Sequence, residues 1–322
     1  MKLRRGSSAI ALAAIAGLAL AGCGSNSLDS GAHKKTAVTS TVDKAAAALV
    51  PAAIKSTGTL TVGSDASYAP SEFLAGDGTT IEGFDVDLFT AVAKVLGLKA
   101  DFQNASFDTI INGVSGNKYD AGVSSFTVTA DREKQANMVS YFTAGVQWAA
   151  TPAKQASVDP TKPCGLNVAV QKGTTELQDN LPPLQKLCKA AGKPIHVLVY
   201  DKQNDATSAV VAGKADTMLA DSPVVAYAVH QSAGKLVAVG PITDSAPYGF
   251  VVSKANTDLA NAIVMALKDL QASGDYTAIL KNWGVDQGAI TDFAANPPAS
   301  GPQSRPLHPS PARPGTGWSG PA

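Results

Sequence analysis

The chain has 322 residues, of which 45% are apolar, and this is enough to bury the cores of two domains of ordinary size. Lys plus Arg and Asp plus Glu both number 26, a balance that argues against a nucleic-acid-binding protein, whose surface would be basic. Aromatic residues make up only 6% of the chain, which argues against an extended aromatic stacking surface.

The N-terminus has the pattern of an export signal. The basic stretch "MKLRR" precedes an apolar run at residues 9–20, which is too short to span a bilayer. Residues 1–22 are therefore predicted as a signal peptide. The sequence "LAGC", which ends at Cys23, resembles a lipoprotein signal, and the resemblance implies that Cys23 is lipidated (palmitate-bearing). An ordinary signal peptide that contains a Cys is the alternative.

Segments at both ends of the chain are poor in large apolar residues. Residues 23–56 are predicted as a flexible, lipid-anchored tether, and residues 293–322 as a disordered, Pro-rich tail. No later segment is apolar enough to span a membrane. The mature protein is therefore expected outside the cytoplasm, anchored to the cell membrane by lipid.

Between these ends, strand-like and helix-like segments alternate. Strands are predicted at 59–63, 99–103, 120–125, 138–151, 166–171, 195–200, 216–220 and 248–253. Helices are predicted at 84–97, 107–116, 130–136, 174–191, 204–212, 222–232, 257–273 and 275–282. This alternation predicts an α/β fold with a mostly parallel sheet, in which ligands bind at the carboxyl ends of strands.

Small hydroxylic and acidic residues follow several of the predicted strands. The clearest stretch is "SSFTVTADR", in which Ser125 and Thr127 precede Arg132. A guanidinium with hydroxyl donors suits a carboxylate, and Asp221, after another strand, suits an ammonium. Together they predict a cleft for a zwitterion. Taken singly, each residue has a simpler explanation as a solvated helix residue or a helix cap.

The remaining cysteines, Cys164 and Cys188, have two interpretations. In an oxidising compartment a disulfide is the leading one, and two buried thiols are the alternative. A zinc site is not expected because none of the four histidines forms a ligand-spaced pair with either Cys; they are His33, His196, His230 and His308.

The stretch "GFDVDLFTAVAKVL" at residues 83–96 resembles the signature of the family 3 extracellular solute-binding proteins, which serve ABC transporters for polar amino acids. The resemblance extends from about Gly58 to Gly284. It implies a two-lobed, periplasmic-binding-protein-like (type II) α/β fold with two hinge strands. Lobe one would comprise residues 57–147 and 248–292, and lobe two would comprise residues 148–247.

The resemblance also implies roles for individual residues. Arg132 matches the arginine that clamps the ligand carboxylate, and Asp221 matches the carboxylate that takes the α-ammonium. Tyr68 and Phe107 match aromatics that sandwich the ligand, and Asp65 matches an acid that faces the ligand side chain. Further donors to the ligand carboxylate are implied at Ser124, Ser125, Thr127, Thr174 and Thr175.

The expected function is therefore capture of a polar amino acid, with basic and amide side chains favoured, for an ABC importer. The expected protein is a monomer without cofactor, metal or catalytic residues, and its partners are permease and ATPase subunits. Glu176 and Asp65 suit a cationic or amide side chain, whereas Lys172 suits an anionic one. Two alternatives stay open: a secreted dehydratase of the same fold acting on a small carboxylate, with Glu176 as general acid, and an extracellular sensory lipoprotein.

Overall fold

The computed structural model describes residues 36–299, all of which belong to one compact unit, His33–Ala322. Residues 1–35 and 300–322 lie outside the described part, so the predicted signal peptide, Cys23, the first part of the tether and most of the tail are not described. Within the described part, α-helices and β-strands alternate along the chain as the sequence predicted, and the fold is a mixed α/β fold with a central sheet.

The central sheet has eight strands in the order β5-β1-β6-β11-β7-β10-β8-β9. One half is built on the parallel strands β1, β5 and β6, and the other on the parallel strands β8, β9 and β10. Their bounds are β1 Thr59–Ser64, β5 Lys99–Asn104, β6 Ala121–Gly122, β8 Asn167–Gln171, β9 His196–Tyr200 and β10 Thr217–Asp221. A separate small sheet is formed by β2 Ser67–Tyr68, β3 Glu72–Leu74 and β4 Ile81–Glu82.

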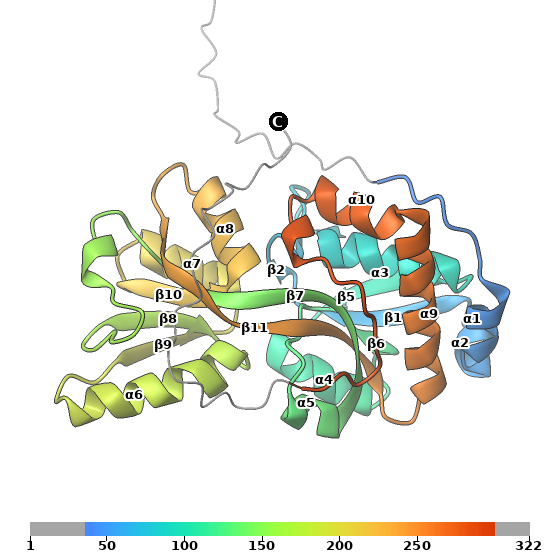
Figure 1. Ribbon diagram of the computed structural model, residues 1–322, viewed down its shortest axis with the longest axis horizontal. Coiled ribbons are helices and arrows are strands. Elements are labelled where there is room, and N and C mark those ends of the chain that lie inside the picture. The colour runs from blue at the N-terminus through green and yellow to red at the C-terminus, as the bar shows by residue number, and fades with distance from the viewer. Residues whose placement is uncertain (1–35, 300–322) are drawn as a thin grey trace, which may run out of the picture. The chain divides into compact units, whose positions relative to one another are not determined.

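Two long strands, β7 (Ala136–Ala150) and β11 (Val237–Ser253), join the two halves. They pair with each other in antiparallel fashion, and Figure 1 shows them side by side between the two halves. β11 also pairs with β6 and β7 with β10, so each half of the sheet is hydrogen-bonded to this pair. The register shifts at three points between Val239 and Gly249, and such irregularities bend a strand. The fold thus has two lobes connected by two strands.

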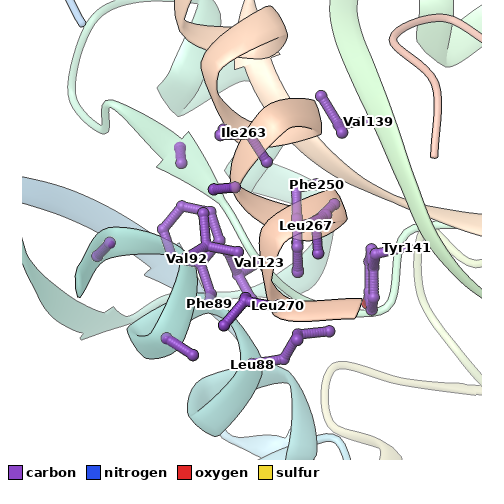
Figure 2. Close-up of a cluster of buried hydrophobic side chains, with 14 of the residues drawn as sticks. Leu88, Phe89, Val92, Val123, Val139, Tyr141, Phe250, Ile263, Leu267 and Leu270 are labelled. Carbon is purple, nitrogen blue, oxygen red and sulfur yellow. The ribbon is translucent and has the colours of Figure 1, made fainter. Parts of the chain in front are cut away.

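Each half of the sheet carries its own helices and its own hydrophobic cores. α3 (Phe84–Val95) and α9 (Thr257–Ser273) pack against each other over the half that contains β1, where Phe89, Phe250 and Leu267 meet in the largest core (Figure 2). Two smaller cores fill the half that contains β8. The remaining helices are α4 Phe107–Ser115, α5 Ala130–Gln135, α6 Leu181–Ala190, α7 Gln203–Val211, α8 Ser222–Gln231 and α10 Asp275–Asn282.

Gly83 allows the start of α3 to lie directly against the chain after β2. Its φ of 142° lies in a region that L side chains rarely adopt, and a Cβ at this position would overlap the backbone carbonyl of Ser71. The contact is sealed by hydrogen bonds from Phe84 N to Pro70 O (3.0 Å) and from Asp85 N to Ser71 O (3.1 Å). The glycine therefore brings the first turn of α3 beside Glu72.

The described part of the predicted tether is not a flexible segment. Two helices, α1 (Lys44–Leu49) and α2 (Ala52–Thr57), bury Ala46 and Ile54 in the largest core. Further upstream, Asp275 at the start of α10 accepts hydrogen bonds from the backbone and hydroxyl groups of Thr39 and Ser40. The expectation of a tether up to residue 56 is corrected for residues 36–56, because apolar alanine-rich helices dock on the domain.

The start of the predicted tail and two predicted elements also differ from expectation. Phe293 is buried, and Ala294 and Asn296 hydrogen-bond to β7 through Ser140 and Met138, so residues 293–296 belong to the folded domain and not to a disordered tail. The helix predicted at 174–191 is a π-helical turn, Glu176–Asn180, followed by α6. β11 begins at Val237, eleven residues before the predicted strand at 248–253.

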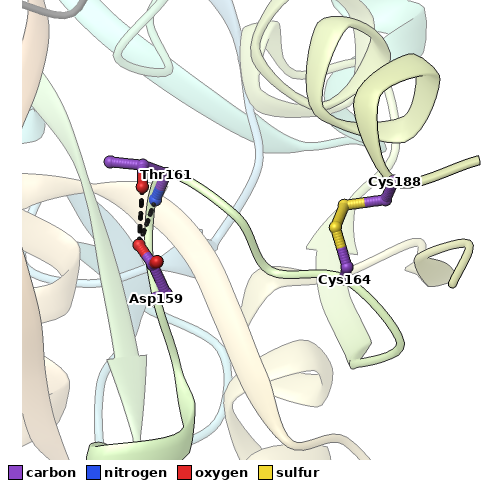
Figure 3. The surroundings of a disulfide bond; sticks show 4 residues. All are labelled: Asp159, Thr161, Cys164 and Cys188. Carbon is purple, nitrogen blue, oxygen red and sulfur yellow. Dashed lines mark hydrogen bonds between the residues drawn. A yellow bond between two sulfur atoms is a disulfide. The ribbon is translucent and has the colours of Figure 1, made fainter. Parts of the chain in front are cut away.

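Cys164 and Cys188 form a disulfide, as the sequence predicted (Figure 3). It ties the loop before β8 to α6, and Cys188 is buried in one of the smaller cores. Nearby, Asp159 Oδ1 accepts hydrogen bonds from the backbone N–H (2.9 Å) and the hydroxyl (2.7 Å) of Thr161, which fixes the turn that leads to Cys164.

We expect Gly83→Ala to lower the free energy of unfolding by about 3 kcal/mol, because it combines an unfavourable φ with backbone overlap. Gly78→Ala is the matched control: Gly78 also has a positive φ (70°), but nothing lies within 4 Å of an added Cβ. The control should lose only about 1–2 kcal/mol. Urea unfolding curves of both variants measure the difference, and equal losses would contradict the close-approach argument.

Candidate functional site

Nine side chains from both halves of the sheet surround a small cavity between the lobes. The cavity is about 10 Å³, roughly the space that the centre of one water molecule needs. An amino-acid-sized ligand therefore requires the walls to move apart. The lining residues are Tyr68, Phe107, Ser125, Thr127, Arg132, Thr174, Thr175, Glu176 and Asp221.

Arg132 is held at the cavity by backbone carbonyls and aromatic rings. It lies in α5, whose N-cap Thr129 accepts a hydrogen bond from Arg132 N (3.2 Å). Its guanidinium donates to Thr127 O (2.9 Å) and, across the seam between the lobes, to Gly173 O (3.1 Å). It also lies over the ring of Phe107, 5.5 Å from the centroid. A fixed, buried guanidinium of this kind can bind a carboxylate through two parallel hydrogen bonds.

The opposite side of the cavity is acidic. Asp221 ends β10 and occupies the N-cap position of α8 without a side-chain capping hydrogen bond, and its Oδ2 accepts a hydrogen bond from the hydroxyl of Tyr68 (2.7 Å). Glu176, at the start of the π-helical turn, is buried beside it. Burial, and then the charge of Asp221, raises the pKa of Glu176 well above its usual range, and burial also raises the pKa of Asp221.

These two acids are close enough for the charge of Asp221 to raise the pKa of Glu176. Glu176 Oε1 is buried and has no hydrogen-bond donor in the described part of the chain. The raised pKa values of both acids favour a proton on one of them, which would leave a single negative charge opposite Arg132. The pKa of Arg132 is lowered by burial and raised by these same two acids.

The wall between these charged groups is made of hydroxyls. Ser125 has an unusual positive φ (47°), and both its backbone N–H (2.9 Å) and its hydroxyl (3.2 Å) donate to Asp85 Oδ2. Its hydroxyl thus offers lone pairs, not a proton, to a ligand. Thr127 Oγ1 lies 3.4 Å from Thr175 Oγ1 on the other lobe, so these hydroxyls meet across the seam.

The structure brings eight of the ten predicted ligand-binding residues to the cavity, and places two behind its wall. Asp65 Oδ2 accepts from Phe107 N (3.0 Å) and from the amide of Gln171 (2.9 Å), while Oδ1 accepts from the hydroxyl of Ser67 (2.6 Å). Ser124 donates its hydroxyl proton to Glu72 Oε1 (2.8 Å) and accepts from Asp65 N (3.1 Å). Both residues hold other parts of the wall in place.

Glu176 is the lining residue missing from the predicted set. The sequence placed it in the ligand side-chain region, as a partner of a cation or amide, but did not select it. Its position in the sequence could have indicated this role, because Glu176 directly follows Thr174 and Thr175 in the loop after β8, and both threonines were predicted to bind the ligand.

Further polar contacts hold the lobes together around the cavity. Ser67 Oγ accepts from Gln203 N (3.2 Å), and Lys172 pairs with Asp108 (2.9 Å) at the exposed rim. Gly173 lies so close to α4 that a Cβ there would come within 2.8 Å of Asp108 Cβ. The lobes thus meet through matched contacts on every side of the cavity.

A sequence model of the bacterial extracellular solute-binding proteins, family 3, matches residues 60–286, which is most of the chain. The chain belongs to this family. This family 3 protein is 36% identical over 250 residues to the arginine-binding protein ArgT of Corynebacterium glutamicum, covering 77% of this chain and 82% of that protein. It is 28% identical over 207 residues to the ABC transporter glutamine-binding protein GlnH of Bacillus subtilis, covering 63% and 72%.

Solved structures of the same fold include binding proteins and a precursor of an enzyme. The family 3 protein is similar to an ancestral arginine-binding protein bound to arginine (TM-score 0.65, 31% identity, covering 70% of this chain and 98% of that chain). It is also similar to an ancestral amino acid-binding protein that is a precursor of cyclohexadienyl dehydratase (TM-score 0.64, 33% identity, covering 72% and 97%). These relatives are binding proteins, and the family 3 protein is a solute-binding protein.

Within residues 36–299, no helix combines the length and the apolar character that crossing a membrane requires. The same part of the chain contains no group of three or more His, Cys, Asp or Glu side chains arranged for a metal ion.

Because Asp65 is committed to three protein donors, we expect Asp65→Ala to lower the free energy of unfolding by about 3 kcal/mol or more. The buried donors on Phe107, Gln171 and Ser67 would lose their acceptor. Chemical denaturation measures the loss, with Asp101→Ala as the control, since Asp101 is exposed on β5. Wild-type stability in Asp65→Ala, with weaker ligand binding alone, would instead indicate that Asp65 contacts the ligand.

Proposed function

We propose that the protein is the extracytoplasmic substrate-binding component of an ABC importer, and that it captures a cationic amino acid between its lobes. Lobe one comprises residues 57–147 and 248–292, and lobe two comprises residues 148–247. The crossing of β7 and β11 between the two halves of the sheet supports these boundaries. The names of the relatives, which include arginine-binding and glutamine-binding proteins, support a polar amino acid as ligand, and the arginine-binding relatives support a cationic one.

The observation that supports a cationic ligand is the charge of the cavity wall. When both acids are ionised, Asp221 and Glu176 outweigh Arg132 by one negative charge, and all three are buried. A cationic amino acid has one carboxylate and two cationic groups, so it neutralises this set. A neutral amino acid requires Glu176 to keep its proton. Burial makes an uncompensated charge expensive, and a ligand with one net positive charge removes it.

The arrangement suggests a role for each side of the cavity. Arg132 and Thr127, with Thr174 and Thr175 at the start of the next helical turn, would bind the ligand carboxylate. Asp221 and the lone pairs of Ser125 would accept from the α-ammonium. Glu176 would then receive the side-chain cation. Tyr68 and Phe107 would cover the aliphatic part.

Ligand would act by closing the lobes. Several of the present contacts cross the seam, among them Arg132 to Gly173 O and Tyr68 to Asp221. A bound amino acid would be held by groups from both lobes at once, and only the closed arrangement offers all of them. A ligand shifts such an equilibrium by its extra contacts in the closed state.

The proposed site of membrane attachment, Cys23, lies outside the described residues. We propose that the mature chain is a monomer anchored to the cell membrane by lipid on Cys23, on the strength of the "LAGC" sequence after an apolar segment. Mass spectrometry of the mature N-terminus would detect the acyl groups, and an unmodified Cys23 or a different N-terminus would exclude them.

Arg132→Ala should weaken arginine binding at least about 100-fold, because two charge-assisted hydrogen bonds to the carboxylate are lost. Lys134→Ala is the matched control: Lys134 lies in the same helix, and its side chain is 74% exposed. Calorimetric titration measures both affinities, and circular dichroism checks the fold. Unchanged affinity in Arg132→Ala would contradict the assignment of Arg132 as the residue that binds the ligand carboxylate.

Glu176→Gln should weaken arginine binding about 10- to 100-fold and leave glutamine binding nearly unchanged, because only the cation loses a charged partner. Asp179→Asn, an exposed acid in the same π-helical turn, is the control. Equal losses for both ligands would contradict the assignment of Glu176 to the side-chain cation while leaving the amino-acid-binding role in place.

Arginine binding should also release protons, because a cation beside Glu176 lowers the pKa that burial had raised. Near pH 6, release should approach one proton per arginine in the wild type and vanish in Glu176→Gln. Glutamine should release none in either protein. Titration calorimetry in two buffers of different ionisation enthalpy gives these numbers, and equal release by both amino acids would be inconsistent with the charge argument.

A further inference from the structure

A second pair of acids lies behind the cavity, in lobe one. Glu72 in β3 and Asp85 in the first turn of α3 are both 0% exposed. Neither lines the cavity, and no cationic side chain in the described part of the chain hydrogen-bonds to either. Two adjacent carboxyl groups in such a place need an explanation, because burial of an unpaired charge is strongly unfavourable.

The backbone forces the two acids together. Gly83 lets the first turn of α3 lie against Ser71, and Asp85 N donates to Ser71 O (3.1 Å). Since Glu72 follows Ser71 directly, its carboxyl group is brought close to that of Asp85, and the charge of Asp85 raises the pKa of Glu72. The two carboxyl groups also accept hydrogen bonds from consecutive residues, Ser124 and Ser125.

The hydrogen-bond donors are unequally distributed between the two acids. Asp85 Oδ2 accepts from three donors: Tyr141 OH (2.6 Å), Ser125 N (2.9 Å) and Ser125 Oγ (3.2 Å). Among residues 36–299, Glu72 Oε1 accepts only from Ser124 Oγ (2.8 Å). The remaining oxygens, Asp85 Oδ1 and Glu72 Oε2, are buried and have no donor within the same residues. One proton on Glu72 Oε2, donated to Asp85, satisfies both of these oxygens.

We propose that Glu72 and Asp85 share one proton at neutral pH, and that this neutral-plus-ionised pair is a positioning unit that fixes Ser124 and Ser125 along the ligand cavity. Glu72 orients the hydroxyl of Ser124, which in turn accepts from Asp65 N (3.1 Å). Asp85 holds the Ser125 backbone in its positive-φ conformation and accepts a hydrogen bond from the Ser125 hydroxyl. The wall of the cavity thus depends on a proton that the ligand never contacts.

The protonation of the pair gives stability a definite dependence on pH. Burial, and then the charge of Asp85, raises the pKa of Glu72 well above its usual 4.5, with Asp65 adding to the effect. Burial raises the pKa of Asp85 to about 6, against hydrogen bonds from Tyr141 and Ser125. The native state thus binds the Glu72 proton more tightly than the unfolded chain does. Its stabilising effect is complete below about pH 4.5 and declines as pH rises through the native pKa.

Two variants at Glu72 test the proposal without any ligand. Glu72→Gln keeps a donor for Asp85 Oδ1 and an acceptor for Ser124, but it cannot titrate. Glu72→Met has similar length and supplies neither. We expect Glu72→Gln to keep the wild-type melting temperature near pH 6, and Glu72→Met to lose several degrees, because Asp85 and Ser124 lose their partners.

The decisive readouts are a vibrational spectrum and a pH series. At pH 7, and in a Glu176→Gln background that removes the cavity proton, infrared spectra should show a buried carboxylic-acid C=O band that Glu72→Gln abolishes. The folding equilibrium constant of the wild type, relative to Glu72→Gln, should fall by up to tenfold per pH unit as the pH rises above 4.5. An unchanged band, or parallel pH curves, would overturn the shared proton.

Ligand binding provides a further readout, with arginine as the probe. Glu72→Gln should bind within about threefold of the wild type, and Glu72→Met at least tenfold more weakly while remaining folded. Equal binding by both variants would overturn the positioning role. Absence of arginine binding in the wild type would refute the proposed ligand, but the infrared and pH experiments would still test the proton.

Discussion

The constraint on which the rest of the structure depends is the antiparallel pairing of β7 and β11. In the described part of the chain, this pair joins two otherwise separate parallel half-sheets, each with its own hydrophobic core. Parallel strands present their carboxyl ends at one edge, and the two halves turn these edges toward the same seam. The cavity is therefore lined from both sides, and its shape follows any bending of the two connecting strands, whose register is irregular between Val239 and Gly249.

Burial at this seam determines how the charged groups are arranged. Arg132 is supported by carbonyl oxygens and aromatic rings, while the acids are grouped in two pairs, Glu176 with Asp221 and Glu72 with Asp85. Each pair reduces its charge by retaining a proton. The two pairs respond differently to a ligand because they lie in different places. The first pair faces the cavity, so a cationic ligand can displace its proton, whereas the second faces only protein and its proton contributes to structure.

The sequence predicted the features that depend on local pattern. Strand ends with hydroxyl or acidic residues identified Ser125, Thr127, Arg132 and Asp221, because strand order and strand direction bring such loops together. Local pattern does not predict the direction in which a side chain points. Asp65 turns away from the cavity because it accepts hydrogen bonds from donors such as Gln171, which is 106 residues away from it in the sequence. The docking of residues 36–57 likewise depends on hydrogen bonds from Thr39 and Ser40 to Asp275, which is 236 residues distant from Thr39, and no local signal reveals them.

The closed cavity also explains how such a site can be selective. Two of its charged groups already have protein partners: Arg132 donates to two carbonyls, and Asp221 accepts from the hydroxyl of Tyr68. Burial favours a proton on Glu176 by raising its pKa. A ligand must replace these contacts with better ones, so only the difference between the two sets contributes to binding. A carboxylate improves on carbonyls as a partner for a guanidinium, and a cation improves on a proton as a partner for two carboxylates. A ligand that lacks either group leaves a buried charge unmatched, and this loss discriminates more strongly than any additional contact.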